Sequence, residues 1–211
     1  MNGEKVLKIE NQYFPIINWF KYSCKSKYII LSSCEEYQKM SFRNRTVICG
    51  SNGLINLSVP IEDGRNQKLP FKDVKISYRE NWQLNHWRSI TSCYGKSPFF
   101  YYYQDELQKL FNKRHSFLLD LNLTILNWLK IVTRLPAQII IAEEDLTIPV
   151  DAEIANLTNK WLPKNFQNDP EVIKYSQVFE DRIGFQPNVS ILDLLFNTGT
   201  EISDLLLGYE E

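Results

Sequence analysis

The strongest indication of the fold lies in residues 6–31, which read VLKIENQYFPIINWFKYSCKSKYIIL. Val6 to Ile9 can form a short strand, and Tyr28 to Leu31 form a second apolar run that is typical of a buried strand. Between them, apolar residues recur every four positions and Pro15 suits a first helical turn, which predicts a helix over about 15–25. Strand, helix and strand in this order predict the opening β-α-β unit of a layered α/β domain.

An antiparallel hairpin is predicted next, from Thr46 to Cys49 and from Leu54 to Val59. The Asn-Gly pair within residues 50–53 supplies the positive φ angles that a tight hairpin turn requires. Residues 62–68 are polar and have no apolar anchor, so they are predicted to form a mobile surface loop. Apolar and polar residues then alternate over 73–78, which predicts a half-buried strand.

From residue 80 the apolar residues follow a helical period. Helices are predicted over about 80–95, 98–111, 117–132, 172–179 and 191–196, and one more buried strand over 137–142. No internal repeat or low-complexity linker marks a second domain. The predicted fold is therefore a single α/β domain of residues 1–211, with a mixed β-sheet flanked by helices and a C-terminal helical extension.

The composition excludes a general electrostatic affinity for nucleic acids or membranes. The 211 residues are 44% hydrophobic and 23% charged, with a net charge of -1, whereas proteins that bind those partners are usually strongly basic. No apolar run approaches the roughly 20 residues that a membrane span needs, and the first residues lack the apolar core of a secretory signal. We expect a cytoplasmic protein with no nucleic-acid or membrane partner, and the sequence gives no oligomeric state.

The sequence predicts neither a cofactor nor a metal. Its four cysteines are widely separated and have no zinc-ligand spacing, so reduced, mostly buried thiols are expected. One acidic set could hold a divalent cation if two strand ends met at one edge of the sheet: Glu35 and Glu36 with Glu143, Glu144 and Asp145. The alternative is that these residues are ordinary polar turns.

Several motifs follow one another in an order and spacing that are quite specific together. They are Tyr37-Gln38-Lys39, Arg43-Asn44-Arg45, the strand from Gly53 to Pro60, Asn81-Trp82 through His86-Trp87, Ser97-Pro98-Phe99-Phe100, Gly184-Phe185 through Asn188-Val189-Ser190, and Asp193 to Phe196. On these motifs the chain resembles the WbqC-like protein family over nearly its whole length. The resemblance implies a bacterial origin and, for some relatives, genes that lie with those for cell-surface polysaccharide. It implies no established reaction.

An anion site is predicted around residues 37–47, which read YQKMSFRNRTV. Residues 38–90 hold nine basic and four acidic residues, so this segment can present a positive face to phosphate or carboxylate. Arg43 and Arg45 alternate on an extended segment, which puts both guanidinium groups on one face. The candidate substrate-binding residues are Tyr37, Lys39, Arg43, Asn44, Arg45 and Trp82. As alternatives, the lysines are solvated edge charges, and the two arginines pair with backbone carbonyls or with Glu35 and Glu36.

His86 is the candidate catalytic residue. It shares one stripe of the predicted helix with Trp82, Ser89 and Cys93. An imidazole whose pKa is near neutrality suits a general base that deprotonates an amine or hydroxyl. The alternative is a half-buried structural histidine that donates to a backbone carbonyl. Asp193 is expected to cap a helix.

The predicted function is that of a cytoplasmic enzyme that acts on an anionic small molecule, an activated or amino sugar, by group transfer. The link to sugars and to cell-surface polysaccharide comes from the resemblance, not from residue patterns. The alternative is a non-catalytic binding or assembly module of the same pathway. Such a module would use as contact surface the aromatic run from Phe99 to Tyr103 and the acidic end at Glu210 and Glu211.

Overall fold

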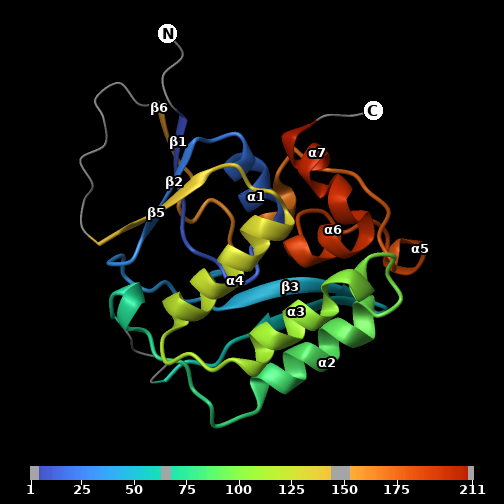
Figure 1. The fold of residues 1–211 in the computed structure, drawn as a ribbon, viewed down its shortest axis with the longest axis horizontal. Coiled ribbons are helices and arrows are strands. Elements are labelled where there is room, and N and C mark those ends of the chain that lie inside the picture. Colours follow the sequence, from blue (N-terminus) through green and yellow to red (C-terminus); the bar gives the residue numbers. More distant parts are fainter. Residues whose placement is uncertain (1–4, 63–67, 144–152, 209–211) are drawn as a thin grey trace.

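The computed structural model describes residues 5–62, 68–143 and 153–208 (Figure 1). Four parallel strands form one sheet in the order β5-β2-β1-β6. These strands are β1 (Lys5–Lys8), β2 (Tyr28–Ser32), β5 (Gln138–Ala142) and β6 (Glu153–Asn156). Helix α1 (Ile17–Cys24) connects β1 to β2, so the predicted β-α-β opening is confirmed.

The two central strands bury both of their faces, which explains why β2 reads as a continuous apolar run. Ile29 is paired with Leu7 on one side and with Ile139 on the other. Side chains alternate along a strand, so Leu7 and Ile29 enter the main core, whereas Ile30 joins a small cluster with Val6 and Ala142.

The hairpin forms a second sheet of two strands, β3 (Arg45–Gly50) and β4 (Gly53–Ser58). Gly50 and Gly53 form its last pair, and Gly53 has a φ of 124°, which an L side chain rarely adopts. Figure 1 shows the hairpin across the middle of the molecule, with the parallel sheet at one end. The α/β class is confirmed, with parallel and antiparallel pairs divided between two sheets.

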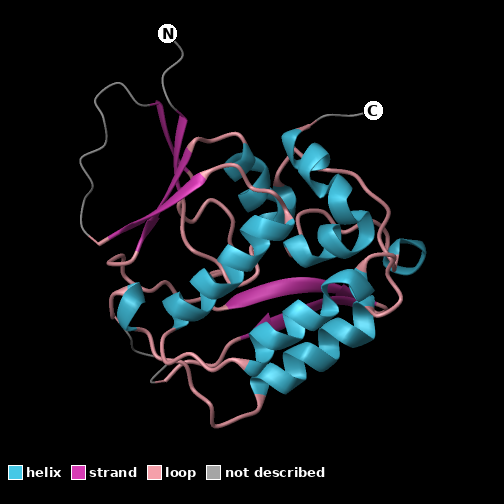
Figure 2. Ribbon diagram, viewed as in Figure 1, coloured by secondary structure: helices cyan, strands magenta, loops and turns pink. Residues whose placement is uncertain are grey.

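The remaining helices pack around the hairpin and the parallel sheet (Figure 2). They are α2 (Trp82–Tyr94), α3 (Phe100–Asn112), α4 (Leu118–Val132), α5 (Glu180–Ile183), α6 (Ile191–Thr198) and α7 (Ile202–Leu207), with short 3-10 turns at Phe71–Asp73, Phe166–Asn168 and Gly199–Glu201. Four predicted helices and the C-terminal helical extension are thereby confirmed. In the described part of the chain, no helix has the length and apolar composition that a membrane crossing requires.

Two predicted elements are wrong. Residues 73–78 form no strand, because they make only isolated bridges with the rest of the described chain. Ile76 bridges to Ile61, and Lys75 bridges to Phe117. Residues 172–179 form no helix. The predicted loop at 62–68 lies largely outside the described residues.

A buried carboxylate explains why residues 172–179 form no helix. Asp193 on α6 accepts hydrogen bonds from the Tyr175 hydroxyl at 2.7 Å and from the Gln177 amide at 3.1 Å. Residues two apart point to the same side of an extended chain, which a helix would not allow. The Tyr94 hydroxyl donates to the other oxygen of Asp193 at 2.7 Å. Asp193 is therefore not the cap of α6; that role belongs to Ser190.

Candidate functional site

Three chain segments meet where adjacent parallel strands end. Glu10 follows β1, Glu35 follows β2 and Asn159 follows β6, and these strands are neighbours in the order β2-β1-β6. Ligands of open α/β sheets commonly bind beyond the carboxyl ends of the strands. The side chain of Arg43 bonds to Glu35 and Asn159, and Asn159 bonds to Glu10. We call Glu10, Glu35, Arg43 and Asn159 the rim cluster.

Arg43 is held firmly inside the rim cluster. Its Nε lies 2.9 Å and its Nη2 2.7 Å from Oε1 of Glu35, and its Nη1 donates to Oδ1 of Asn159 at 2.8 Å. The backbone N–H of Asn159 donates in turn to Glu10 at 2.7 Å. Arg43 is 1% exposed. This is the buried ion-pair alternative that the sequence left open, and it leaves Arg43 neutralised.

Only one carboxylate oxygen of Glu35 bonds to Arg43. Both of its contacts with Arg43 end on Oε1, and over the described ranges no hydrogen bond reaches Oε2. The side chain is 18% exposed. Burial raises the pKa of Glu35, although the charge of Arg43 beside it acts in the opposite direction. A carboxyl with a raised pKa and one accessible oxygen can accept or give a proton.

Arg45 differs from Arg43 because it has no acidic partner among the residues that the structure describes. It begins β3, its side chain is partly exposed, and its Nε is buried with no hydrogen bond. The ring of Tyr37 is buried close to both arginines: burial raises the pKa of Tyr37, whereas the charges of Arg45 and Arg43 lower it. The structure thus places Tyr37, Arg43 and Arg45 within electrostatic reach of one another.

Two other predicted binding residues have different surroundings. Asn44 is buried, and its amide donates to the carbonyl of Val59 at 2.9 Å, so it holds β3 to the end of β4. The side chain of Lys39 is exposed, with no bond to the described parts of the chain.

Buried amides near the rim cluster have unused hydrogen-bonding capacity. Asn11 lies between Glu10 and Gln12, is fully buried, and has no partner for either amide atom. Asn122 donates to the carbonyl of Arg43 at 2.8 Å, but its own Oδ1 has no partner. Such atoms are nearly always satisfied in proteins, which suits them to a bound ligand or an ordered water. The run Glu10-Asn11-Gln12 directly after a buried strand is the sequence signal that could have identified this segment.

The ring of His86 is buried and has two hydrogen-bond partners in the core. Its Nδ1 lies 2.9 Å from the hydroxyl of Tyr13, and the ring also bonds to the backbone of Ser58. Burial lowers the pKa of His86 to about 4. Trp82 packs edge-on against the ring at 5.2 Å, and its Nε1 is buried without a partner. These contacts favour the alternative that His86 is structural. Its partner Ser58 lies opposite Arg45 in the hairpin.

The two strand ends of the acidic set proposed for a cation do meet, because β2 and β5 pair in parallel, and Cys34 donates to the carbonyl of Glu143. The carboxylates, however, are not grouped. Glu35 takes part in the ion pair with Arg43, and Glu36 is exposed. Glu144 and Asp145 lie outside the described residues, as do the acidic residues at 210 and 211. Across the described ranges, no three His, Cys, Asp or Glu side chains are grouped as metal ligands.

Comparison with known proteins identifies a family for this chain. Residues 11–162 match the WbqC-like protein family. The chain is also 29% identical to an uncharacterized protein, Rv1507c, of Mycobacterium tuberculosis, over 96% of this chain and 97% of that protein. No solved structure matches the chain. Since the family match covers well over half of the sequence, the chain belongs to the WbqC-like protein family.

Proposed function

We propose that this protein is an enzyme that binds an anionic small molecule beside the rim cluster and transfers a group to or from it. The observation that carries the proposal is the contrast between two neighbouring arginines. Arg43 is neutralised by Glu35, whereas Arg45 retains a buried Nε with no partner. A partly buried cation without a counterion favours a ligand that brings negative charge.

Each polar group has a separate role in this proposal. Arg45 binds the anionic group, and the ring of Tyr37 forms a wall beside it. In the transfer, the amine or hydroxyl forms a bond to the transferred group as the bond between that group and its donor breaks, and the donor leaves with the bonding electron pair. The proton that the amine or hydroxyl loses goes to Oε2 of Glu35. We assign this role to Glu35 rather than His86, because Glu35 is more exposed and has a free oxygen.

The substrate that we propose is an activated or amino sugar handled in the cytoplasm for cell-surface polysaccharide. The resemblance to the WbqC-like family supports this choice, which is an argument from association. An activated sugar carries phosphate groups, which match the single unpaired guanidinium of Arg45.

A thermal-shift screen with nucleotide-linked sugars and inorganic phosphate tests the proposal. A ligand at 100 times its dissociation constant stabilises a protein by about 2.7 kcal/mol. Arg45→Gln should abolish the shift, whereas Arg88→Gln, which changes an exposed arginine on α2, should retain it. Equal shifts in both variants, or no shift with any anion, would contradict the proposal.

One observation favours a second function, that of a binding module. Tyr101 and Tyr102 on α3 are 78% and 76% exposed, although large aromatic side chains usually have a buried face. Phe100 before them is buried and Tyr103 is partly buried, so only part of the aromatic run is exposed. If this surface binds a protein, Tyr101→Ser together with Tyr102→Ser should abolish a complex that Arg45→Gln leaves intact.

A further inference from the structure

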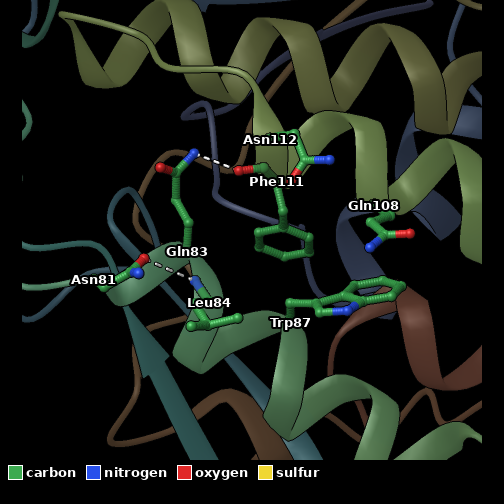
Figure 3. Close-up of a pocket in the computed structure, with 7 residues that line it drawn as sticks. All are labelled: Asn81, Gln83, Leu84, Trp87, Gln108, Phe111 and Asn112. Carbon is green, nitrogen blue, oxygen red and sulfur yellow. Dashed lines mark hydrogen bonds between the residues drawn. The ribbon is translucent and has the colours of Figure 1, made fainter.

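A hollow of about 270 Å³ lies between the first turns of α2 and the last turns of α3. Two aromatic and four amide side chains line it: Trp87, Phe111, Asn81, Gln83, Gln108 and Asn112. We propose that this hollow binds one neutral pyranose ring. Figure 3 shows the two aromatic rings at the middle of the hollow and the amides around them.

The aromatic part of the hollow is held in place by packing. The ring of Trp87 lies 6.1 Å from Phe111 and 6.2 Å from Phe100, measured between centroids. Trp87 is partly exposed, whereas the other four tryptophans of the chain are buried. An indole fixed in this way offers an apolar face without losing side-chain freedom when a ligand binds.

The amides provide both donors and acceptors. Gln83 donates to the carbonyls of Phe111 and Lys113 at 2.6 and 2.8 Å, which leaves its Oε1 to accept. Asn81 accepts from the backbone N–H of Leu84 at 3.4 Å, which leaves its Nδ2 to donate. These three bonds orient the amides before any ligand arrives, and Figure 3 draws those that join Gln83 to Phe111 and Asn81 to Leu84.

Gln108 and Asn112 complete the polar edge of the hollow. Both are exposed, and neither has a hydrogen bond within the parts of the chain that the structure describes. They lie four residues apart on α3, so both side chains project from the same face of the helix. Their amides are therefore available to a ligand seated on Trp87.

This set of groups fits a sugar ring better than the other small ligands that stack on aromatics. The hydroxyls of a pyranose both donate and accept, as amides do, and its C–H face is apolar. No charged side chain lines the hollow, so it offers no cation to balance a phosphate. A nucleobase cannot be sandwiched between Trp87 and Phe111, because the planes of these rings are inclined by 51°.

The inference does not rest on the proposed function. The hollow lies on the face shared by α2 and α3, whereas the rim cluster lies at the carboxyl edge of the parallel sheet. His86 bonds to Tyr13 and to the backbone of Ser58 in the core. Its ring also contacts the hollow through Phe111, at 6.5 Å between centroids.

Tryptophan fluorescence gives a direct test, because Trp87 is the partly exposed indole of the five. The intact protein is titrated with methyl glycosides of glucose, galactose and N-acetylglucosamine, up to roughly 50 mM because single sugar rings bind weakly. A saturable change in emission is expected for at least one glycoside. Gln108→Ala and Asn112→Ala should each weaken binding roughly 3- to 10-fold, the effect of losing one hydrogen bond.

The matched control is Asn127→Ala, which removes an exposed amide from α4 outside the hollow. It should bind the glycoside as the parent protein does. No saturable change with any glycoside would overturn the inference. Tighter binding of adenosine or inorganic phosphate at the same tryptophan would also overturn it, as would equal weakening by Asn127→Ala.

Discussion

The guanidinium of Arg43 approaches a single carboxylate oxygen of Glu35 through two nitrogens, Nε at 2.9 Å and Nη2 at 2.7 Å. The pair joins the segment after β2 to the segment before β3. Because Arg43 is almost completely buried, its positive charge needs this carboxylate as a counterion. The pair therefore stabilises the fold around the site, whereas Arg45 has no such partner among the described residues.

Removing Glu35 should be costly. Glu35→Ala leaves the guanidinium of Arg43 buried and without a counterion, and we expect the free energy of unfolding to fall by about 3 kcal/mol. Urea denaturation followed by circular dichroism measures the loss. Glu36→Ala is the matched control, because it removes an exposed carboxylate one residue away and should change stability by less than about 0.5 kcal/mol. Equal losses in the two variants would show that the ion pair has no special role.

The buried carboxylate of Asp193 should make its tyrosine partners important for stability. Tyr94→Phe removes the hydroxyl that donates to Oδ2 at 2.7 Å and also accepts from the backbone N–H of Cys49. We expect a loss of about 2 kcal/mol, since the hydrogen bond is made to a charged or acidic acceptor. Tyr101→Phe serves as the control, because its hydroxyl lies on an exposed side chain. A Tyr94→Phe protein as stable as the parent would contradict this account.

Acid should destabilise the protein through His86. Burial lowers the pKa of His86 from 6.5 to about 4 in the folded protein. Between these two values the unfolded chain binds a proton that the folded chain does not, so stability falls as the pH falls from 6.5 to 4. A shift of this size corresponds to roughly 3 kcal/mol.

The variant His86→Gln isolates this contribution. The parent should lose roughly 3 kcal/mol more than the variant between pH 7 and pH 4, measured by urea denaturation at each pH. Glu35 and Asp193 act with the opposite sign, because their raised pKa values make stability fall as the pH rises above the ordinary carboxyl range. Both groups are present in both proteins, so their effect cancels in the comparison. Identical pH dependence in the two proteins would mean that His86 does not titrate as its burial requires.

The sequence predicted those elements whose residues follow a clear period. The opening strands, the hairpin and the long helices from α2 to α4 were placed within a few residues, because each buries a regular apolar face. It did not predict β6 (Glu153–Asn156), a four-residue edge strand with exposed side chains and no apolar alternation. Apolar and polar residues alternate over 73–78 as they would in a strand. The segment nevertheless makes only two isolated bridges, to Ile61 and to Phe117.

The sequence predicted only the part of the candidate site that lies in one continuous segment. The sequence identified the segment from Glu35 to Arg45, and it left open whether Arg43 was free or paired. It could not join Glu10 and Asn159 to this segment, because they lie 149 residues apart and meet only through the strand order. His86 was chosen for its ordinary pKa, which its burial between Tyr13 and Ser58 then lowered.

The central claim is that Arg45, and not Arg43, meets an anionic ligand. NMR of protein labelled with ¹⁵N-arginine measures this most directly, because each Nε–H gives its own signal, and the variant Arg45→Lys assigns the one from Arg45. On titration with a nucleotide-linked sugar, the account predicts that the Arg45 signal shifts and saturates while that of Arg43, bonded to Glu35, changes little. A shift confined to Arg43, or no shift at Arg45 while the ligand binds, would contradict it.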